Sequence, residues 1–278
     1  MCTTIIQNGT VYDGSGAPPE QADITIQNGK IVCIGQASNH QAHKVIDATG
    51  LAVAPGFIDI HSHTDLTISS NPLSNSKLLQ GVTTEATGNC GISLFPVNQN
   101  RRDELKKYLK MHGAILPETG ITWHDLEEYS QVLEQIGLGL NIAPLVGHSP
   151  LRMAVMGSDN RKPLKGELDQ MKYLLEKSLK QGAWGLSTGL VYPPSSFGET
   201  EELIELSKVL AEFDSLFTCH VRNESGSLLE SVEELIRLGK ESGARVQFSH
   251  LKALGKPNWG KGKLALTRIK AAAAQGVD

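Results

Sequence analysis

Two patterns of hydrophobic and polar positions divide the chain near residue 54. Before it, short segments alternate apolar and polar residues and are bounded by Asn or Gly, as in residues 4–9, 24–29 and 30–35. Alternation with a period of two is typical of strands with one buried face, and Asn-Gly pairs are typical of tight hairpin turns. We expect residues 1–54 to form β-hairpins of a small sheet, with Asn8-Gly9 and Asn28-Gly29 as corners.

After residue 54, short apolar runs alternate with stretches of helical periodicity. Leucines recur at helical spacing in three segments: after Pro163, after Thr200 and before Gly243. Thr200 could cap the second of these expected helices, and Gly243 is expected to end the third. The expected strands are residues 56–61, 81–87, 139–146, 183–190, 216–221 and 245–250, with a seventh starting at Val277.

This alternation predicts an α/β fold. Six or more βα units without a Gly-x-Gly-x-x-Gly sequence after the first strand favour a closed (β/α)8 barrel of the TIM type over a dinucleotide-binding sheet. Such a barrel usually takes about 250 residues by itself, more than follow residue 54. Residues 55–278 are therefore expected to form an incomplete barrel with six to seven βα units, missing its last strands.

Composition narrows the classes of partner. The chain has 278 residues, and its net charge of -4 comes from interspersed acidic and basic residues, which disfavours nucleic acid and anionic membranes as partners. No apolar stretch approaches the about 20 residues of a membrane span, and no signal sequence opens the chain. Four scattered cysteines, rather than a disulfide framework, favour a reducing compartment, and the cytoplasm is the expected location.

The first candidate site is a pair of histidines at the end of the first expected barrel strand. His61 and His63 stand at positions i and i+2, so in an extended strand both imidazoles point to one face. A His-x-His pair alone is equally well explained as a surface or hydrogen-bonded pair. Its position at the carboxyl end of a barrel strand, where such barrels hold their active sites, favours a metal-binding pair.

Two later expected strands end in the same way. His220 and His250 stand at the ends of the fifth and sixth strands, so four of the nine histidines fall on one rim. Cys90 follows the second strand and reaches this rim, where a thiolate could bind zinc; a buried structural cysteine is the alternative. Cys219 alternates with His220 and is expected in the core.

Two neighbouring residues leave their roles open. Asp65 either orients a ligand histidine or is an ordinary loop carboxylate. His148, near the end of the third strand, either faces the substrate or is a hydrogen-bonded loop histidine. Zinc at this rim would lower the pKa of bound water from about 15.7 to about 7 and polarise a carbonyl oxygen, so amide or ester hydrolysis becomes feasible. A carboxylate would then carry the proton to the leaving nitrogen.

These motifs together resemble a known family. Residues 55–65 resemble the Pro-Gly-Phe-Ile-Asp-x-His-x-His signature of the amidohydrolase superfamily. Residues 81–93, 186–194, 220–224 and 249–252 narrow the resemblance to the N-acyl-D-amino-acid deacylases (D-aminoacylases). Dihydroorotases and hydantoinases differ, because they bridge their metals with a carboxylated lysine on the fourth strand, and residues 183–190 contain no lysine.

The resemblance implies a zinc hydrolase that releases a D-amino acid and a carboxylate from an N-acyl-D-amino acid. It implies a tightly bound zinc and a second, weaker metal position, substrate-binding residues, and a small β-sandwich domain that residues 1–54 begin. The implied tight-zinc ligands are Cys90, His220 and His250, those of the weaker position are His61 and His63, and the residues for the substrate carboxylate are Tyr192 and Lys252.

One feature of the family has no counterpart in this sequence. The family's catalytic aspartate follows the eighth strand, beyond residue 278, so we expect little or no turnover from these 278 residues alone. Tyr192 and Lys252 have simpler explanations, as a packed loop residue and a solvated charge. The alternatives for the whole are a related amidohydrolase that acts on a cyclic amide or dipeptide, and an inactive truncated product.

Overall fold

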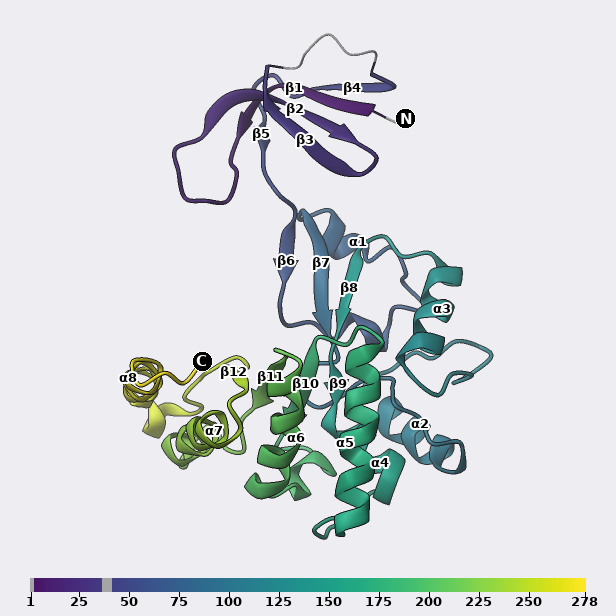
Figure 1. Ribbon diagram of the computed structural model, residues 1–278, viewed down its shortest axis with the longest axis vertical. Helices are drawn as coiled ribbons and strands as arrows, with labels where there is room; N and C mark the ends of the chain where they lie inside the picture. The colour runs from purple at the N-terminus through teal and green to yellow at the C-terminus, as the bar shows by residue number, and fades with distance from the viewer. Residues whose placement is uncertain (1–2, 37–41) are drawn as a thin grey trace. The chain divides into compact units, whose positions relative to one another are not determined.

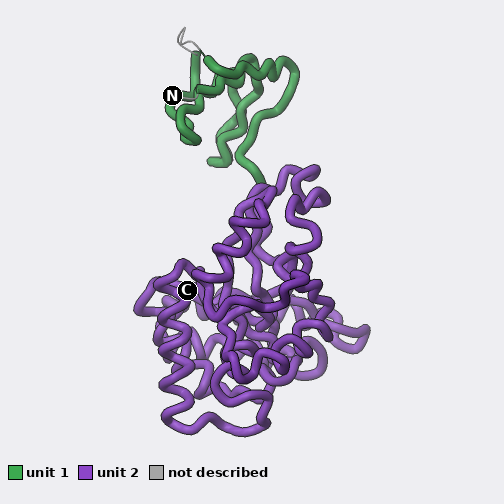
Figure 2. The backbone as a smooth tube through the Cα atoms, turned by 90° about the vertical axis from the view of Figure 1, so that its right-hand side faces the viewer, with its two compact units in different colours: residues 1–57 green, residues 58–278 purple. Residues whose placement is uncertain are grey.

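The computed structural model describes residues 3–36 and 42–278, and Cys2 lies outside them. The chain divides into two compact units, residues 1–57 and residues 58–278 (Figure 2). The expected boundary after residue 54 lies three residues before the observed one.

The smaller unit is built on a five-stranded sheet (Figure 1). Its strands are β1 (Thr3–Val11), β2 (Glu20–Gln27), β3 (Lys30–Gly35), β4 (Lys44–Asp47) and β5 (Ala52–Val53). The order is β3-β2-β1-β4, with β5 also pairing β1; β2 is antiparallel to β1 and β3, whereas β4 and β5 run parallel to β1. The hairpin β2–β3 turns at Asn28-Gly29, as predicted, and both residues have the positive φ of such a turn.

The other predicted corner was wrong. Asn8-Gly9 lies inside β1 and forms an irregularity in its pairing with β2 rather than a turn. Asn8 has a φ of 62°, and its backbone N–H donates to Asp23 Oδ1 at 2.9 Å. Gly9 is required there because a Cβ would lie 2.5 Å from Val53 Cγ2. An Asn-Gly pair thus serves a bulge as well as a hairpin.

The larger unit confirms an α/β fold, with all six expected strand regions present. Its strands are β6 (Phe57–Asp59), β7 (Val82–Thr87), β8 (Asn141–Pro144), β9 (Val146–Gly147), β10 (Gly185–Gly189), β11 (Leu216–His220) and β12 (Arg245–Phe248). They form a three-stranded sheet β6-β7-β8 and a four-stranded sheet β12-β11-β10-β9. Leu145 alone separates β8 from β9, so one predicted strand takes part in both sheets.

Helices lie between these strands, and α4 to α8 pack on one another in chain order (Figure 1). They are α1 (Asn75–Leu78), α2 (Arg102–Met111), α3 (Leu126–Ile136), α4 (His148–Met156), α5 (Lys165–Lys180), α6 (Thr200–Glu212), α7 (Leu228–Ser242) and α8 (Lys261–Ala273). The three helices predicted from leucine spacing are α5, α6 and α7. Gly243 ends α7 in a left-handed conformation, but Thr200 is the first helical residue of α6 and the capping position belongs to Glu199.

The core of the larger unit lies between the four-stranded sheet and its helices. Leu186 and Phe217 from the strands and Leu175, Leu206 and Leu235 from the helices have no exposed surface. Pairs β9–β10, β10–β11 and β11–β12 are parallel, so the carboxyl ends of these strands meet at one edge. That edge carries His220 and His250, whereas His61, His63 and Cys90 follow strands β6 and β7 of the three-stranded sheet.

Two expectations about the barrel differ from the structure. The described residues form two separate sheets, and no closed barrel is present among them. Val277 does not begin a strand, although the carbonyl of Asp278 accepts a 2.9 Å hydrogen bond from the Val246 N–H of β12. A β-strand pairs with its neighbour along several residues, and this single hydrogen bond does not make residues 277–278 a strand.

Candidate metal centre

His61 and His63 lie in the turn that follows β6. The strand ends at Asp59, two residues earlier than predicted, and the His61 N–H donates to Asp59 Oδ1 at 3.1 Å. The two imidazole centroids are 5.5 Å apart and the rings are nearly perpendicular. The rings are therefore neighbours, but a turn rather than strand alternation brings them together.

Cys90 is fixed in a buried turn after β7. Its φ of 54° is unusual for a residue with a side chain, and the following Gly91 donates from its N–H to Ser187 Oγ at 3.0 Å. A Cβ on Gly189 would lie 2.1 Å from the Cys90 carbonyl oxygen, so β10 approaches this turn as closely as only glycine allows. The thiol is held 3.4 Å from His61 Nε2 and 3.6 Å from His250 Nε2.

His220 and His250 come from neighbouring strands. His220 is the last residue of β11, and His250 stands two residues after the end of β12 with a φ of 36°. Their ring centroids are 4.4 Å apart, and the His250 ring is 5.0 Å from that of His61. Parallel pairing of β11 with β12 thus brings both imidazoles to the same edge.

The donor atoms fall into two overlapping groups, each with all its atoms within 4.8 Å of one another. One group is His61, Cys90 and His250, and the other is His220, Glu224 and His250. Four of the five predicted ligands are therefore gathered, whereas His63 lies beside His61 and belongs to neither group. The grouping also differs from the predicted one, because His220 shares a group with His250 but not with Cys90.

Sequence reasoning missed Glu224. Its side chain is only 9% exposed, and its Oε1 lies 3.5 Å from His220 Nε2 and 3.0 Å from His250 Nδ1. It stands four residues after His220 in a polar segment, where a glutamate usually faces solvent. The signal that could have found it is the spacing alone, since an acidic residue shortly after a candidate ligand can reach the same rim.

Burial sets the protonation states of the group. It lowers the pKa of His61 to about 4, helped by the neighbouring charges of His250 and His63. It also lowers the pKa of His220 to about 4, although Glu224 opposes the shift. These imidazoles are neutral at pH 7 and each keeps a free lone pair. Burial raises the pKa of the Cys90 thiol to about 11, so without a cation the thiol keeps its proton.

A zinc ion fits this set of residues. Imidazole nitrogen and thiolate sulfur are the donors that zinc prefers, and a coordinating thiol gives up its proton to the metal. Buried nitrogens also lack partners: His63 Nδ1 and His220 Nδ1 form no hydrogen bond with any described residue. Unpaired buried polar atoms are costly, and a bound cation with its ligands would satisfy atoms of this kind.

The two predicted substrate-binding residues border the cluster. The Tyr192 ring packs edge-on against His220, with centroids 5.2 Å apart. Lys252 is half exposed, and its Nζ lies 2.7 Å from Glu224 Oε1 and 3.0 Å from His250 Nδ1. Both side chains thus contact residues of the cluster.

Cys219 is fully buried in the core, as predicted. Burial raises the pKa of Asp65 to about 7, against the opposing influence of nearby backbone amides. Its Oδ1 is buried and has no hydrogen-bond partner among the described residues. His148 is the buried first residue of α4 and forms hydrogen bonds with Ser195 and Glu202. Of its two predicted roles, the structure therefore agrees with a hydrogen-bonded histidine rather than one that faces a substrate.

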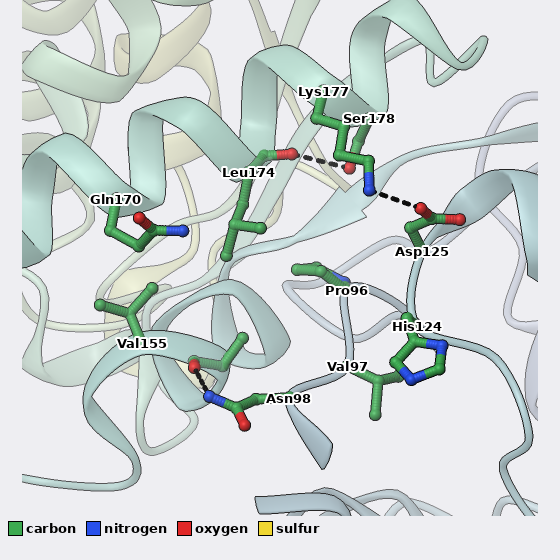
Figure 3. Close-up of a pocket in the computed structure, with 11 residues that line it drawn as sticks. Pro96, Val97, Asn98, His124, Asp125, Val155, Gln170, Leu174, Lys177 and Ser178 are labelled. Atoms are coloured by element: carbon green, nitrogen blue, oxygen red, sulfur yellow. Dashed lines mark hydrogen bonds and ion pairs between the residues drawn. The ribbon is translucent and has the colours of Figure 1, made fainter. Parts of the chain in front are cut away.

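A pocket of about 380 Å³ lies elsewhere in the larger unit (Figure 3). It is bordered by α5 and by residues 96–98 and 124–125, and none of the cluster residues lines it. Lys177 bonds to Asp125 at 2.7 Å across its rim, and Asn98 donates to the Ala154 carbonyl. The pocket is therefore separate from the histidine cluster.

Residues 44–276 match the family described as Amidohydrolase family. The chain belongs to the amidohydrolase family. Among curated relatives, this amidohydrolase is 37% identical to the N-acyl-D-aspartate deacylase of Alcaligenes xylosoxydans xylosoxydans, over 97% of the chain and 53% of that protein. It is 36% identical to the D-aminoacylase of the same organism, over 98% of the chain and 55% of that protein. The chain thus spans about half the length of the curated relatives it matches.

Solved structures give the same picture of the fold. The N-acyl-D-glutamate deacylase of Bordetella bronchiseptica, solved with zinc and a phosphonate inhibitor, matches with a TM-score of 0.88 and 37% identity over 99% of this amidohydrolase and 56% of that chain. A D-hydantoinase structure, at 18% identity and a TM-score of 0.61, shares the fold. In the part of the chain that the structure describes, each helix is too short or too polar to span a bilayer.

Proposed function

We propose that this amidohydrolase uses zinc to cleave the amide bond of N-acyl-D-amino acids, releasing a carboxylate and a free D-amino acid. The observation that carries the proposal is the convergence of His61, Cys90 and His250, with His220 beside them, in a chain 36–37% identical to relatives named as deacylases of this class. A small-molecule substrate, rather than nucleic acid, also agrees with the net charge of -4.

Cys90, His220 and His250 would hold the tight zinc, and His61 and His63 the second, weaker position. Cys90 Sγ lies 3.4 Å from His61 Nε2 and 3.6 Å from His250 Nε2, so its thiolate would lie near residues of both positions. A bound zinc ion would supply Lewis-acid polarisation of the scissile carbonyl. Cys90 is buried and the next residue, Gly91, is hydrogen-bonded to Ser187, so packing would hold the thiol at the cluster.

Lys252 and Tyr192 would bind the α-carboxylate of the substrate. The Lys252 side chain is 46% exposed beside His250, so its ammonium group can be reached from solvent and still lies at the cluster. Tyr192 is half-buried with its ring against His220. A charge beside His250 and a phenol ring beside His220 would together fix the orientation of an anionic substrate.

The six successive βα units and the TM-score of 0.88 support a (β/α)8 barrel as the parent architecture of residues 55–278. Residues 1–54 would belong to a β-sandwich domain. A cytoplasmic location belongs to the proposal as well, because the three described cysteines, Cys33, Cys90 and Cys219, are free thiols.

The test combines binding with hydrolysis. The zinc-loaded protein is titrated calorimetrically with N-acetyl-D-glutamate, N-acetyl-L-glutamate and hydantoin, and the release of free amino acid or ring-opened product is followed in the same samples. We expect the D compound to bind in preference to the L compound, and any hydrolysis to be confined to the D compound. Equal binding of the enantiomers, or ring opening of hydantoin, contradicts the proposal.

A further inference from the structure

We infer that Glu85, a buried residue of β7, is a positioning residue that fixes the turn carrying His61 and His63 for metal binding. The inference rests on the proposed zinc site and concerns the backbone that presents the two imidazoles. This segment, residues 59–64, is called the histidine turn; it begins at the last residue of β6 and lies beside the end of β7. Glu85 is connected to it by two separate routes.

Glu85 is an unusual residue for its place in the fold. Its side chain has no exposed surface, although it belongs to a strand of the three-stranded sheet. Its Oε2 is buried without a hydrogen-bond partner among the described residues, and Oε1 makes both polar contacts of the side chain. A buried carboxyl group with an unpaired oxygen is costly to the fold. Residues that conflict with stable packing in this way are expected at functional sites.

The first route runs through Ser62, the residue between the two histidines. Ser62 Oγ donates to Glu85 Oε1 at 2.9 Å, and the Ser62 N–H donates to the Ala86 carbonyl at 3.0 Å. Ser62 Oγ also accepts from the Thr64 N–H at 3.2 Å and lies 2.8 Å from Thr64 Oγ1. The middle of the histidine turn is therefore bound to β7 by a side chain and by the backbone.

The second route runs through Lys77 of α1. Lys77 Nζ lies 2.9 Å from Glu85 Oε1 and also pairs with Asp59 Oδ2. Asp59 Oδ1 in turn accepts from the His61 N–H at 3.1 Å. The side chains of Lys77 and Asp59 are 30% and 29% exposed, so Glu85 is the buried member of this network. Without it, a partly exposed ion pair would remain, and such pairs hold a backbone weakly.

The two routes reach the histidine turn on both sides of His61, at Asp59 and at Ser62. His61 Nε2 lies 3.4 Å from Cys90 Sγ, so a displaced turn would separate the imidazole from the thiol. Metal-binding side chains must be held to about 0.5 Å for tight binding. Because β7 also leads into the turn that holds Cys90, Glu85 fixes the histidine turn to the same strand that places the thiol.

The experiment measures the affinity of each zinc equivalent by competition with a chromophoric chelator, so it does not depend on turnover. His61→Ala identifies the equivalent that depends on the histidine turn. Glu85→Ala should weaken that equivalent about 10–100-fold, because both routes are lost. Ser62→Ala removes only the first route, and Glu85→Gln keeps an oxygen for Ser62 but no charge for Lys77, so each should lose less.

The matched control is Glu202→Gln. Glu202 is also a buried glutamate paired with a cation: its side chain is 3% exposed, and its partners are Arg152 and His148, outside the histidine turn. This change should lower the melting temperature and leave every zinc affinity unaltered. The comparison separates a loss of stability from a loss of positioning.

The outcomes distinguish the role of Glu85 from the zinc site itself. Wild-type zinc affinity in Glu85→Ala and Ser62→Ala overturns the role of Glu85 while the site stands, and if Glu85→Ala does not fold, Ser62→Ala decides alone. An equal loss of affinity in Glu202→Gln also overturns it, since destabilisation would then explain both. A wild-type protein that binds no zinc, or whose zinc affinity His61→Ala leaves unchanged, overturns the proposed site and the inference with it.

Discussion

A buried charge network inside the larger unit gives the sharpest stability prediction. Arg152 has no exposed surface and pairs with Glu202, whose side chain is 3% exposed. Glu202 also accepts from His148 Nε2 at 2.9 Å, and His148 Nδ1 lies 2.9 Å from the buried Ser195 Oγ. The change Glu202→Gln keeps the shape of the side chain but leaves the Arg152 guanidinium without a countercharge.

The expected cost follows from that isolation. Removing one partner of a buried ion pair costs about 3–5 kcal/mol, because the remaining charge is neither hydrated nor neutralised. Glu205 on the same helix is the control: it pairs with Lys172 and Lys208, but its side chain is 33% exposed. Glu205→Gln should cost less than about 1 kcal/mol, as surface pairs do.

Acid should reduce the difference between wild type and Glu202→Gln. Burial alone would raise the pKa of Glu202, but the hydrogen bonds and charges of His148 and Arg152 outweigh it and hold the pKa below its usual value. The carboxylate therefore stabilises the fold above the unfolded pKa of about 4.3, and this contribution is lost as pH falls through the lower folded value.

Urea unfolding at pH 7 and again near pH 3.5 measures both effects. We expect Glu202→Gln to be far less stable than Glu205→Gln at pH 7 and closer to the wild type in acid. If the two variants lose the same stability at pH 7, the buried network does not carry the energy assigned to it.

Three further predictions concern packing and metal. Gly189→Ala places a Cβ 2.1 Å from the Cys90 carbonyl oxygen and should lower the free energy of unfolding by about 3 kcal/mol. Gly166→Ala in α5, where a Cβ meets open space, should raise it by about 0.4–1 kcal/mol, and urea unfolding of both variants measures the difference. Leu175→Ala should cost about 2–5 kcal/mol in the same assay, since Leu175 has no exposed surface. Zinc at 100 times its dissociation constant should stabilise the fold by about 2.7 kcal/mol, and a melting temperature that chelation leaves unchanged would count against a zinc site.

The parts of the fold that sequence predicted are those with a strong local pattern. Alternating and helical periodicity located the six strand regions of the larger unit and helices α5 to α7, because burying one face imposes that period on the chain. Asn8-Gly9 was misread because the same pair suits a bulge and a turn. Closure of a barrel depends on distant strand pairs, which leave no local pattern in the sequence.

The candidate site divides in the same way. Histidines at strand ends could be predicted because parallel strands bring their carboxyl ends together. Four of the five predicted ligands fall into two donor groups that share His250. Neither the position of Glu224 beside the histidines nor the buried network of Glu202 could be predicted from the sequence, because both depend on contacts between segments far apart along the chain. A carboxylate in a polar segment gives no sign that it is buried against an imidazole or a guanidinium.

The central claim is that Cys90 and the histidines beside it bind zinc through one sulfur and several nitrogens. X-ray absorption at the zinc edge, on protein loaded with one equivalent, tests it directly. The account predicts one sulfur neighbour at about 2.3 Å and nitrogen neighbours at about 2.0–2.1 Å, with the sulfur lost in Cys90→Ser. A zinc shell of oxygen and nitrogen alone, unchanged by Cys90→Ser, would contradict it.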